Sequence, residues 1–523
     1  TIQLLPVGEY IVTVEKAGFM ASRQTGVIVQ ANTDVQVDLT LKVGTSSAEI
    51  TVSENATLVQ TATTNRVQIV DQARIESLPL NGRNILELTS LDAGVGNSSG
   101  IGNNREATVQ LQTLGGGAYN APVTVNGSRV NGTNFLLDNA NHNDRYTNVN
   151  LPLPNPDAIQ EFSMQTSTFD AQYGRGLGGV VNVVTKSGSN TLHGSAFEFV
   201  RNYDMNARNF FSGQDSLKRN QFGFALGGPV QLPRLYHGKD RTFFLASYQG
   251  TRQTIASPGL ATAPSAAMKA GDFSAWLGAG GSGAIYDPGS GQPFPNNRIP
   301  ASRFDPISEK LLKSMPPSSD PSYILRFPTA TVRTTDDQYL IRGDHYVSSK
   351  SRFFGRYFNL LYDNPWATLP DNLYFVSTGS YGQTQSAMVD HSYAFSPRLY
   401  NDVSVSYLRS RTQSEPPAEL LNAGNLALLG ARVYPVPQGA VLSVGITGWS
   451  GISGNSYTYD HLQSSYAIAD NVGYAIGKHQ LRFGGEFLRF SMDYTASWQT
   501  DGFASFTGQY SGVVGKTNAG NAF

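Results

Sequence analysis

The sequence predicts a mostly β protein in three parts: a partial β-sandwich, an α+β unit and an incomplete antiparallel transmembrane β-barrel. From about residue 193 onward, aromatic-rich alternating segments are separated in turn by tight turns and long loops, as in membrane barrels. Charged residues make up only 15% of the 523 residues, against about 25% in average soluble proteins. The chain is also rich in Gly (54), Tyr (25) and Phe (27), which suits a large β-structure with polar, uncharged surfaces.

Residues 1–52 are predicted to form a small β-unit. Period-two alternation with Gly and Asn punctuation indicates strands at Tyr10–Val14, near 26–30 and through 35–41, and Glu49–Val52 is a last strand or a linker. About 50 residues is short for a β-sandwich, which usually has about 100. Because the chain also begins within a β-pattern, we expect the N-terminal strands of this unit to be missing from the sequence.

The segment LPVGEYIVTVEKAGF resembles the closing half of the carboxypeptidase regulatory-like domain, an Ig-like module. The resemblance implies an Ig-like sandwich and an accessory role rather than an activity. The seven histidines are dispersed and no HExxH motif occurs, so the sequence gives no support to a zinc peptidase site.

Residues 57–188 mix strand and helix signals. A strand-like stretch at 63–73 precedes a turn at 75–84, and Ile85–Leu91 has helical spacing. Further on we expect two strand-and-turn segments, one helical turn and a strand, at 123–127, 134–139, 156–159 and 159–165.

The stretch Tyr173–Gly188 is predicted to end this α+β unit. Its glycines lead into the β-branched strand Val180–Thr185, and they permit either a sharp turn or a close backbone approach. The four glycines are Gly174, Gly176, Gly178 and Gly179. They match GxGxxG formally, but a dinucleotide site needs a helix after them, and here a strand follows. We therefore interpret them as structural, with Val180–Thr185 paired inside the α+β unit and the first barrel strand beginning within a few residues of Gly194.

Residues 192–523 are predicted to be the N-terminal part of a barrel. Roughly ten strands of about ten residues are expected, with long loops near 252–334 and 411–459. The strands are predicted at 195–201, 220–227, 241–251, 337–347, 351–362, 385–395, 399–410, 466–476 and 479–492. Since large plugged barrels have about twenty-two strands, we expect a sequence truncated at both ends.

Three segments carry a resemblance to the plug of the TonB-dependent receptors: IESLPLNGRNILELTSLDAGV, FLLDNANHND and AIQEFSMQTSTFDAQYGRGLGGVVNVVTKSG. In the second, Asn139 replaces the usual turn glycine, a mild departure because Asn also tolerates turn geometry. Together with the N-terminal module, the pattern is most similar to the Oar-like subgroup. The resemblance implies a bacterial outer-membrane receptor that contacts outer-membrane lipid, has the TonB energy-transducing complex as partner and imports an external ligand. A siderophore, an oligosaccharide and a peptide all remain open as that ligand.

The resemblance also implies candidate ligand-binding residues in a polar plug loop that points outward in this family. These are Asn141, His142, Asn143, Asp144, Arg145 and Tyr146. The alternative for each is a solvated loop built on Asx turns.

Other motifs are assigned to structure. Asp336-Asp337 is expected at a solvated barrel rim, Arg342-Gly343-Asp344 falls inside a predicted strand, and the pairs Phe353-Phe354 and Tyr357-Phe358 are expected in aromatic girdles rather than in a sugar site. We predict no catalytic residues, no cofactor and no metal site. The net charge of −1 argues against nucleic-acid binding. Two other functions stay open: a surface adhesion or assembly protein on the same barrel, and a soluble β-rich glycan-binding protein.

Overall fold

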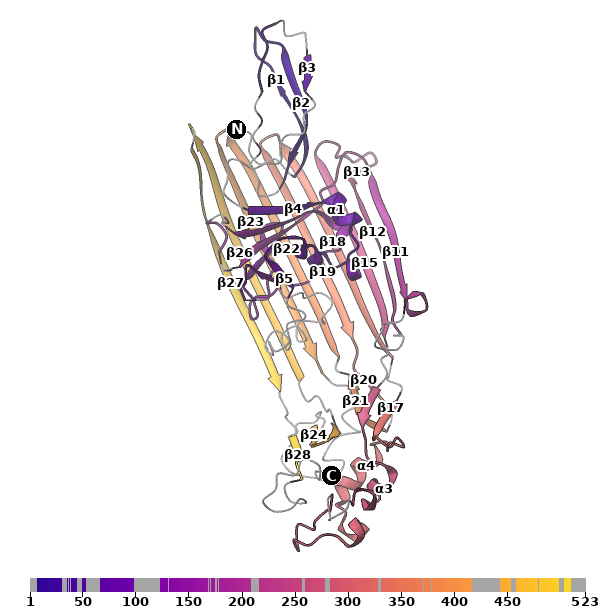
Figure 1. Cartoon of the computed structure of the whole chain (residues 1–523). Helices are drawn as coiled ribbons and strands as arrows, with labels where there is room; N and C mark the ends of the chain where they lie inside the picture. Colours follow the sequence, from indigo (N-terminus) through magenta and orange to yellow (C-terminus); the bar gives the residue numbers. More distant parts are fainter. Residues whose placement is uncertain are drawn as a thin grey trace.

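The computed structural model shows a large sheet that carries a compact unit on one face, a small sheet at one end and short elements at the other end (Figure 1). We call the large sheet the wall and the compact unit, from Arg66 to Thr185, the inner unit. No helix within the described ranges is long and apolar enough to cross a membrane. The structure describes residues 7–30, 35, 37, 39–44, 49–52, 66–97, 123–129, 131–167, 169, 171–174, 176, 178–207, 216–255, 259–277, 283–327, 331–369, 371–377, 379–415, 443–452, 458–477, 479–497 and 503–508.

The small sheet has the order β1-β2-β3, with β1 (Gly8–Val14) antiparallel and β3 (Glu49–Val52) parallel to β2 (Ala21–Val29). Glu49–Val52 is therefore a strand rather than a linker. β2 begins earlier than predicted, at Ala21, and the described residues of 35–41 form no strand.

The inner unit contains a five-stranded sheet of order β4-β9-β10-β7-β8. The strands are β4 (Arg66–Asp71), β7 (Thr133–Leu137), β8 (Ala140–Asn141), β9 (Ile159–Ser167) and β10 (Gly179–Thr185). Separate from it, β5 (Val95–Asn97) pairs with β6 (Val123–Val125). The helices are α1 (Gln72–Ser77), η1 (Asn81–Arg83), η2 (Ile85–Leu91) and η4 (Pro156–Ala158). A core that includes Ile75, Leu86, Val125, Phe162 and Val181 joins the sheet to the helices.

Two local predictions change in this unit. The segment 75–84 is not a turn throughout, because α1 extends to Ser77 after Asp71 caps its first turn by accepting a hydrogen bond from Arg74 N. The helical spacing at Ile85–Leu91 is realised as a 3-10 helix.

The predicted pairing of Val180–Thr185 is confirmed, since β10 lies parallel to β7 and antiparallel to β9. The glycines before it serve close approach rather than a left-handed turn. A Cβ added at Gly176 would lie 2.6 Å from Gly132 O, and one at Gly179 would lie 2.9 Å from Gln165 O. A Cβ added at Gly178 would meet the side-chain hydroxyl of Ser128, whereas Gly174 faces open space.

The wall is a nine-stranded antiparallel sheet in which each wall strand pairs with the wall strand that follows it in the sequence. Its first strand begins at His193, as predicted. The strands are β11 (His193–Asn202), β12 (Lys218–Pro229), β15 (Thr242–Ile255), β18 (Val332–Ser348), β19 (Ser351–Asn364), β22 (Ser380–Ser396), β23 (Leu399–Ser414), β26 (Thr458–Ile476) and β27 (His479–Ser497). Within the described residues the sheet is open, with β11 and β27 at its edges.

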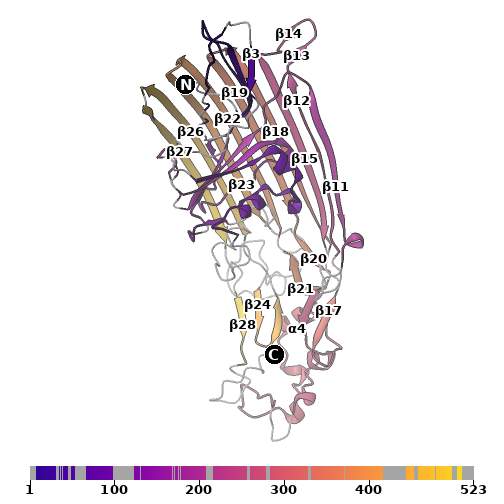
Figure 2. The same ribbon diagram turned by 45° about the horizontal axis from the view of Figure 1, so that its top comes forward.

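The strands are longer than the ten residues predicted and reach 19 in β26 and β27. A tilted strand needs only about 9–11 residues to cross a bilayer, so the extra length extends beyond the membrane. Tight turns join the strand pairs at 348–351, 396–399 and 476–479, and this edge is called the turn end. The long connections lie at the opposite edge, the loop end (Figures 1 and 2).

The loop end also has secondary structure of its own. Three small sheets form there: β16 pairs with β17, β20 pairs with β21, and β24 lies between β25 and β28. The bounds are β16 (Gly259–Thr262), β17 (Ile324–Phe327), β20 (Ala367–Leu369), β21 (Asn372–Ser377), β24 (Ser443–Ile446), β25 (Trp449–Ile452), β28 (Phe503–Phe506), α3 (Ala266–Lys269), α4 (Pro306–Lys313), η6 (Ser274–Trp276), η8 (Pro295–Asn297) and η9 (Ala301–Arg303). The remaining short elements are η5 (Tyr203–Met205), β13 (Gln231–Leu232) and β14 (Tyr236–His237).

Successive wall residues point to opposite faces, which corrects the girdle prediction. Phe353 and Tyr357 are about 40% exposed on the outer face, as a girdle requires. Phe358 is fully buried against the inner unit, and the ring of Phe354 lies under the guanidinium of Arg342. Each aromatic pair therefore contributes one residue to the outer face and one to the interior.

Candidate functional site at the interface of the inner unit and the wall

The turn between β7 and β8 brings an acidic residue of the inner unit to the wall. Asp138 and Asn139 both have positive φ, 52° and 66°, a conformation that Asp and Asn adopt more readily than most residues. Asn139 is fixed by its neighbour in β10: Asn139 N donates to Asn182 Oδ1 (3.1 Å), and Asn182 Nδ2 donates to Asn139 Oδ1 (2.9 Å). The Asn139 side chain therefore adds one hydrogen bond that a glycine at this position could not make.

The Asp138 carboxylate binds partners from both units. It accepts hydrogen bonds from Thr185 N (2.8 Å) and Thr185 Oγ1 at the end of β10. It also contacts Arg356 Nε (2.8 Å) and Arg342 Nη1 (3.4 Å) on the wall. These side chains are at most 5% exposed, so the turn is held to the wall by a buried ion pair.

The ion pair is part of a larger charge cluster. Asp344 accepts hydrogen bonds from Arg342 Nε and Nη2 (both 2.9 Å) and from Arg352 Nη2 (2.6 Å). We define the charge cluster as Asp138, Arg342, Asp344, Arg352 and Arg356; three guanidinium groups face two carboxylates. Arg342 and Asp344 are thus buried partners inside a strand, which excludes an exposed Arg-Gly-Asp recognition motif.

The hairpin proposed to bind ligand is mostly buried, which corrects the alternative of a solvated loop. His142, Asn143 and Asp144 have no exposed surface. Asn143 Oδ1 accepts from Phe135 N (2.6 Å), and its Nδ2 donates to Thr133 O (3.1 Å).

His142 is held neutral by its surroundings. Its Nε2 lies 2.7 Å from Pro152 O, which places the proton on Nε2. Burial lowers the pKa of His142 to about 4, and the nearby Arg356 acts in the same direction.

The same hairpin makes a second contact with the wall. Asp144 Oδ1 accepts from Tyr146 N (3.0 Å), closing an Asx turn, and also from Thr147 N (2.7 Å). Its Oδ2 meets the side-chain amide of Gln463 on β26 and lies 4.0 Å from His461 Nδ1. Arg145 N donates to Gln463 Oε1 (2.8 Å).

Of the six candidates, Tyr146 alone is exposed, at 51% of its surface. Its ring lies 5.4 Å from that of Tyr494 and 5.9 Å from that of His461. Asn141 and Arg145 are half-buried.

A third contact comes from the segment Asn81-Gly82-Arg83, to which sequence reasoning gave no role. Arg83 forms an ion pair with Asp157 and donates from Nε to Gln249 Oε1 (2.9 Å) on β15. Its guanidinium lies 4.2 Å and 4.6 Å from the ring centres of Phe197 and Phe199 on β11. Burial lowers the pKa of Arg83, and Asp157 opposes that shift.

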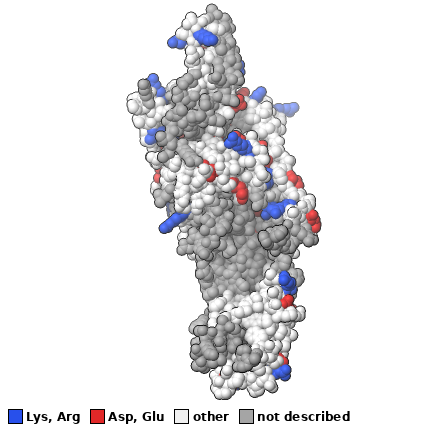
Figure 3. Space-filling view, in the orientation of Figure 1, with Lys and Arg blue, Asp and Glu red and all other residues white. Residues whose placement is uncertain are grey.

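The acidic pair Asp336-Asp337 is not a solvated rim. Asp337 faces outward and pairs with Arg252 at 2.8 Å, whereas Asp336 faces inward and is 2% exposed. Within the described residues no group of three or more His, Asp or Glu side chains is arranged to hold a metal ion. On the face shown in Figure 3, the described charged side chains are scattered rather than gathered in one patch.

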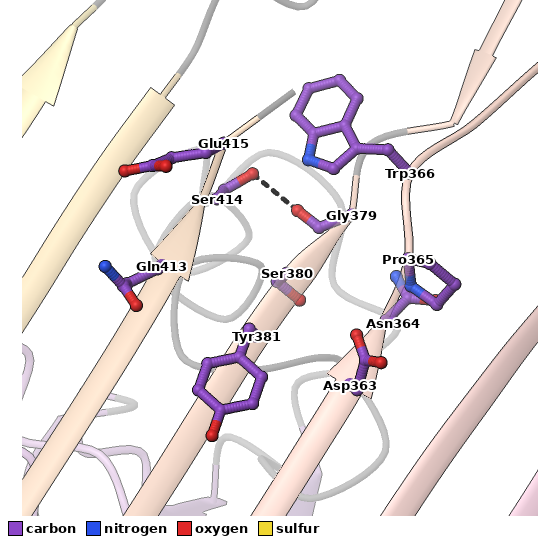
Figure 4. Close-up of a pocket in the computed structure, with 10 residues that line it drawn as sticks. All are labelled: Asp363, Asn364, Pro365, Trp366, Gly379, Ser380, Tyr381, Gln413, Ser414 and Glu415. Atoms are coloured by element: carbon purple, nitrogen blue, oxygen red, sulfur yellow. Dashed lines mark hydrogen bonds between the residues drawn. The ribbon is translucent and has the colours of Figure 1, made fainter. Parts of the chain in front are cut away.

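A small hollow lies at the loop end, where β19 and β23 end and β22 begins (Figure 4). Its volume is about 240 Å³, and Ser414 Oγ donates to Gly379 O (2.5 Å) across it. The hollow also holds the side chains of Asp363, Trp366 and Glu415. Trp366 Nε1 is buried and has no hydrogen-bond partner within the described residues.

A wall of antiparallel strands has tight turns at one end, long loops at the other and a separate α+β unit bound to its inner face. This architecture is that of an outer-membrane β-barrel protein. The comparisons agree. Residues 184–523 match the outer membrane beta barrel domain family, and the chain belongs to that family and to the bacterial outer membrane. The predicted fold class is confirmed.

Among curated proteins, the chain is similar to the TonB-dependent transporter Oar of Myxococcus xanthus, with 26% identity over 262 residues that cover 48% of this chain and 23% of that protein. Among solved structures, it resembles the outer membrane transporter YddB of Escherichia coli (12% identity, TM-score 0.47, 82% of this chain and 48% of that one). It also resembles a mutant ferric enterobactin receptor, PfeA, of Pseudomonas aeruginosa in complex with enterobactin (12%, TM-score 0.45, 83% and 50%). The chain thus spans about a quarter of the curated relative and about half of these solved chains.

Proposed function

We propose that this chain is part of a TonB-dependent outer-membrane transporter. In it, residues 1–52 are the carboxypeptidase regulatory-like module, 57–188 the plug and 192–523 the N-terminal part of the barrel. An external ligand binds at the loop end, the TonB complex acts from the turn end, and the plug rearranges so that the ligand passes. No covalent chemistry is needed.

The observation that carries the proposal is the large polar share of the contact between plug and wall. The plug has its own apolar core, whereas its contacts with the wall include the charge cluster, the Asp144–Gln463 contact and the Arg83–Asp157 group. The apolar part of the contact is a cluster in which Ala158 of the plug packs with wall residues that include Leu245 and Phe358. Polar partners can exchange a protein contact for water at a small net cost, while an apolar core cannot. Such an interface suits a unit that stays folded while it moves against the wall.

The ligand site is proposed at the hairpin Asn141–Tyr146. Tyr146 offers an exposed ring, Asn141 and Arg145 are half-buried beside it, and His142, Asn143 and Asp144 hold the hairpin in place. The curated relative is named a transporter, which supports import rather than adhesion. A siderophore, an oligosaccharide and a peptide are the ligand classes to test.

The test is uptake in a deletion strain complemented with the full-length protein, with and without the TonB complex. Candidate siderophores, oligosaccharides and peptides are supplied as radiolabelled nutrients. The proposal expects uptake of at least one class that requires both the protein and the complex. Unchanged uptake of every class, together with lost surface attachment, would contradict it and favour the adhesion alternative.

A further inference from the structure

The inner face of β18 carries two buried polar side chains whose oxygens lack a partner. Asp336 and Gln338 are each 2% exposed. Among the described residues, no donor meets either carboxylate oxygen of Asp336 or the amide oxygen of Gln338. A buried carboxylate without a hydrogen bond or a counter-charge is strongly unfavourable, and such a group in a folded protein calls for a proton, a water or an ion.

The arginine beside Asp336 is engaged on the other face of the wall. Asp337 faces outward, where its carboxylate pairs with Arg252 at 2.8 Å. Arg252 also donates from Nη1 to the main-chain oxygen of Asp336 (3.0 Å). Its guanidinium is therefore held by Asp337 and by backbone, and it leaves the inward carboxylate of Asp336 without a counter-charge.

The arginine of the plug that approaches this part of the wall is engaged as well. Arg83 donates from Nε to Gln249 Oε1 (2.9 Å), and Gln249 lies opposite Gln338 in the register of β15 and β18. The charge of Arg83 is met by Asp157, with which it forms an ion pair. A counter-charge for Asp336 therefore has to come from outside the described protein.

The unpartnered oxygens are placed to share one ion. Asp336 and Gln338 occupy alternate positions of β18, so they point to the same face and lie about 6.6 Å apart along the strand. Thr251, opposite Asp336 in β15, places a hydroxyl on that face too. An ion about 2.3–2.6 Å from each oxygen bridges side chains at this spacing, and both oxygens of Asp336 are open to a bidentate contact.

The chemistry of these ligands selects a hard cation, because all of them are oxygens. Ca²⁺ accepts bidentate carboxylates and amide oxygens in a flexible geometry, whereas Mg²⁺ demands a near-ideal octahedron and keeps most of its water. A site with one carboxylate is weak, and extracellular Ca²⁺ modules bind with a Kd of about 10⁻⁴ to 10⁻³ M. Asp336 lies near the loop end of β18, which faces the external medium in the orientation proposed above.

We propose that Asp336 and Gln338 bind one Ca²⁺ on the inner face of the wall. The ion supplies the counter-charge of Asp336 and satisfies the amide oxygen of Gln338. The sequence predicts no metal site, and an amide beside a single carboxylate forms no group of acidic residues or histidines that would indicate one. Binding does not depend on import through the barrel; only the access of the site to external Ca²⁺ rests on the proposed function.

Binding is tested with the full-length protein, purified in detergent and freed of divalent cations by a chelator. Equilibrium dialysis against radioactive calcium measures the number of bound ions. Asp336→Asn keeps the shape of the side chain and is expected to bind one ion fewer than the unaltered protein. Gln338→Leu is expected to weaken this site at least tenfold. Asp337→Asn, which removes the neighbouring carboxylate on the outer face, is the matched control and is expected to bind like the unaltered protein.

A second measurement reports on the site itself. Tb³⁺ replaces Ca²⁺, and its luminescence is excited through tyrosine; Tyr362 lies opposite Asp336 in β19. The signal is expected to weaken in Tyr362→Phe, to be lost in Asp336→Asn and to be displaced by Ca²⁺ but not by Na⁺ at equal concentration. Folding of each variant is checked by its heat-dependent shift in electrophoretic mobility. Equal numbers of bound calcium ions in folded Asp336→Asn, the result for a protonated or merely hydrated acid, or displacement of Tb³⁺ by Na⁺ would overturn the proposal.

Discussion

Replacing Asp138 by Asn tests whether the charge cluster holds the plug against the wall. The substitution keeps the shape of the side chain and removes one of two carboxylates that face three guanidinium groups. Arg342 and Arg356, at 5% and 0% side-chain exposure, would then lose their carboxylate partner in the plug and keep only the neutral oxygens of Thr185 and Leu137 there. Removing one member of a buried ion pair costs about 3–5 kcal/mol.

The cost should appear as easier opening of the interface. At about 1.4 kcal/mol for each factor of ten, the loss corresponds to a 100-fold or larger increase in the open population. Hydrogen exchange of the β7 and β10 amides near Asp138 and Thr185 measures that population. The core around Phe162 and Val181 lies within the plug, so the plug should stay folded.

Asp363→Asn is the matched control, because this carboxylate is exposed on the outer face at the loop end. It should leave exchange at β7 and β10 unchanged. A change of less than about fivefold in exchange for Asp138→Asn, below roughly 1 kcal/mol, would refute the reasoning that the charge cluster fixes the plug.

Three other predictions concern the plug. Arg83→Lys keeps the charge but loses the planar stacking on two rings, so exchange at η1 should rise several-fold, and wild-type exchange would contradict the assigned contact. Gly179→Ala should destabilise the plug by about 1–3 kcal/mol in thermal unfolding because its Cβ meets backbone, whereas Gly174→Ala should be neutral; equal effects would be inconsistent with close approach. His142 has a folded pKa of about 4, below its ordinary 6.5, so the unfolded state binds more protons between these values and stability should fall as pH drops from 6.5 to 4, by about 3 kcal/mol. His142→Gln should flatten that pH dependence, and a parallel pH profile would count against burial as its cause.

The wall strands and the glycine segment that leads into β10 could be predicted because their signals are local. Alternating residues mark each strand, and the glycines before Val180 mark the close approach at the end of the plug. The sequence predicts strands that are too short, because loop-end residues such as Thr458 carry no apolar pattern although they pair as regular strand.

The contacts of the site could not be predicted, because they join distant segments. Asp138 and Arg342 are 204 residues apart, and their meeting depends on how the plug sits in the barrel. One signal was available: Leu340, Arg342 and Asp344 alternate on one face of β18, so charges on the same face as a buried leucine indicate an interior polar contact.

The central claim is that the plug must move against the wall for the ligand to pass. Asn155 Nδ2 of the plug lies 3.0 Å from Ser247 Oγ of the wall, and the sequence has no cysteine. The pair Asn155→Cys and Ser247→Cys therefore offers a reversible lock, whose formation is followed by thiol titration. The account predicts that the oxidised protein still binds its ligand but imports none, and that reduction restores import. Uptake at the full rate through the oxidised, fully cross-linked protein would contradict it.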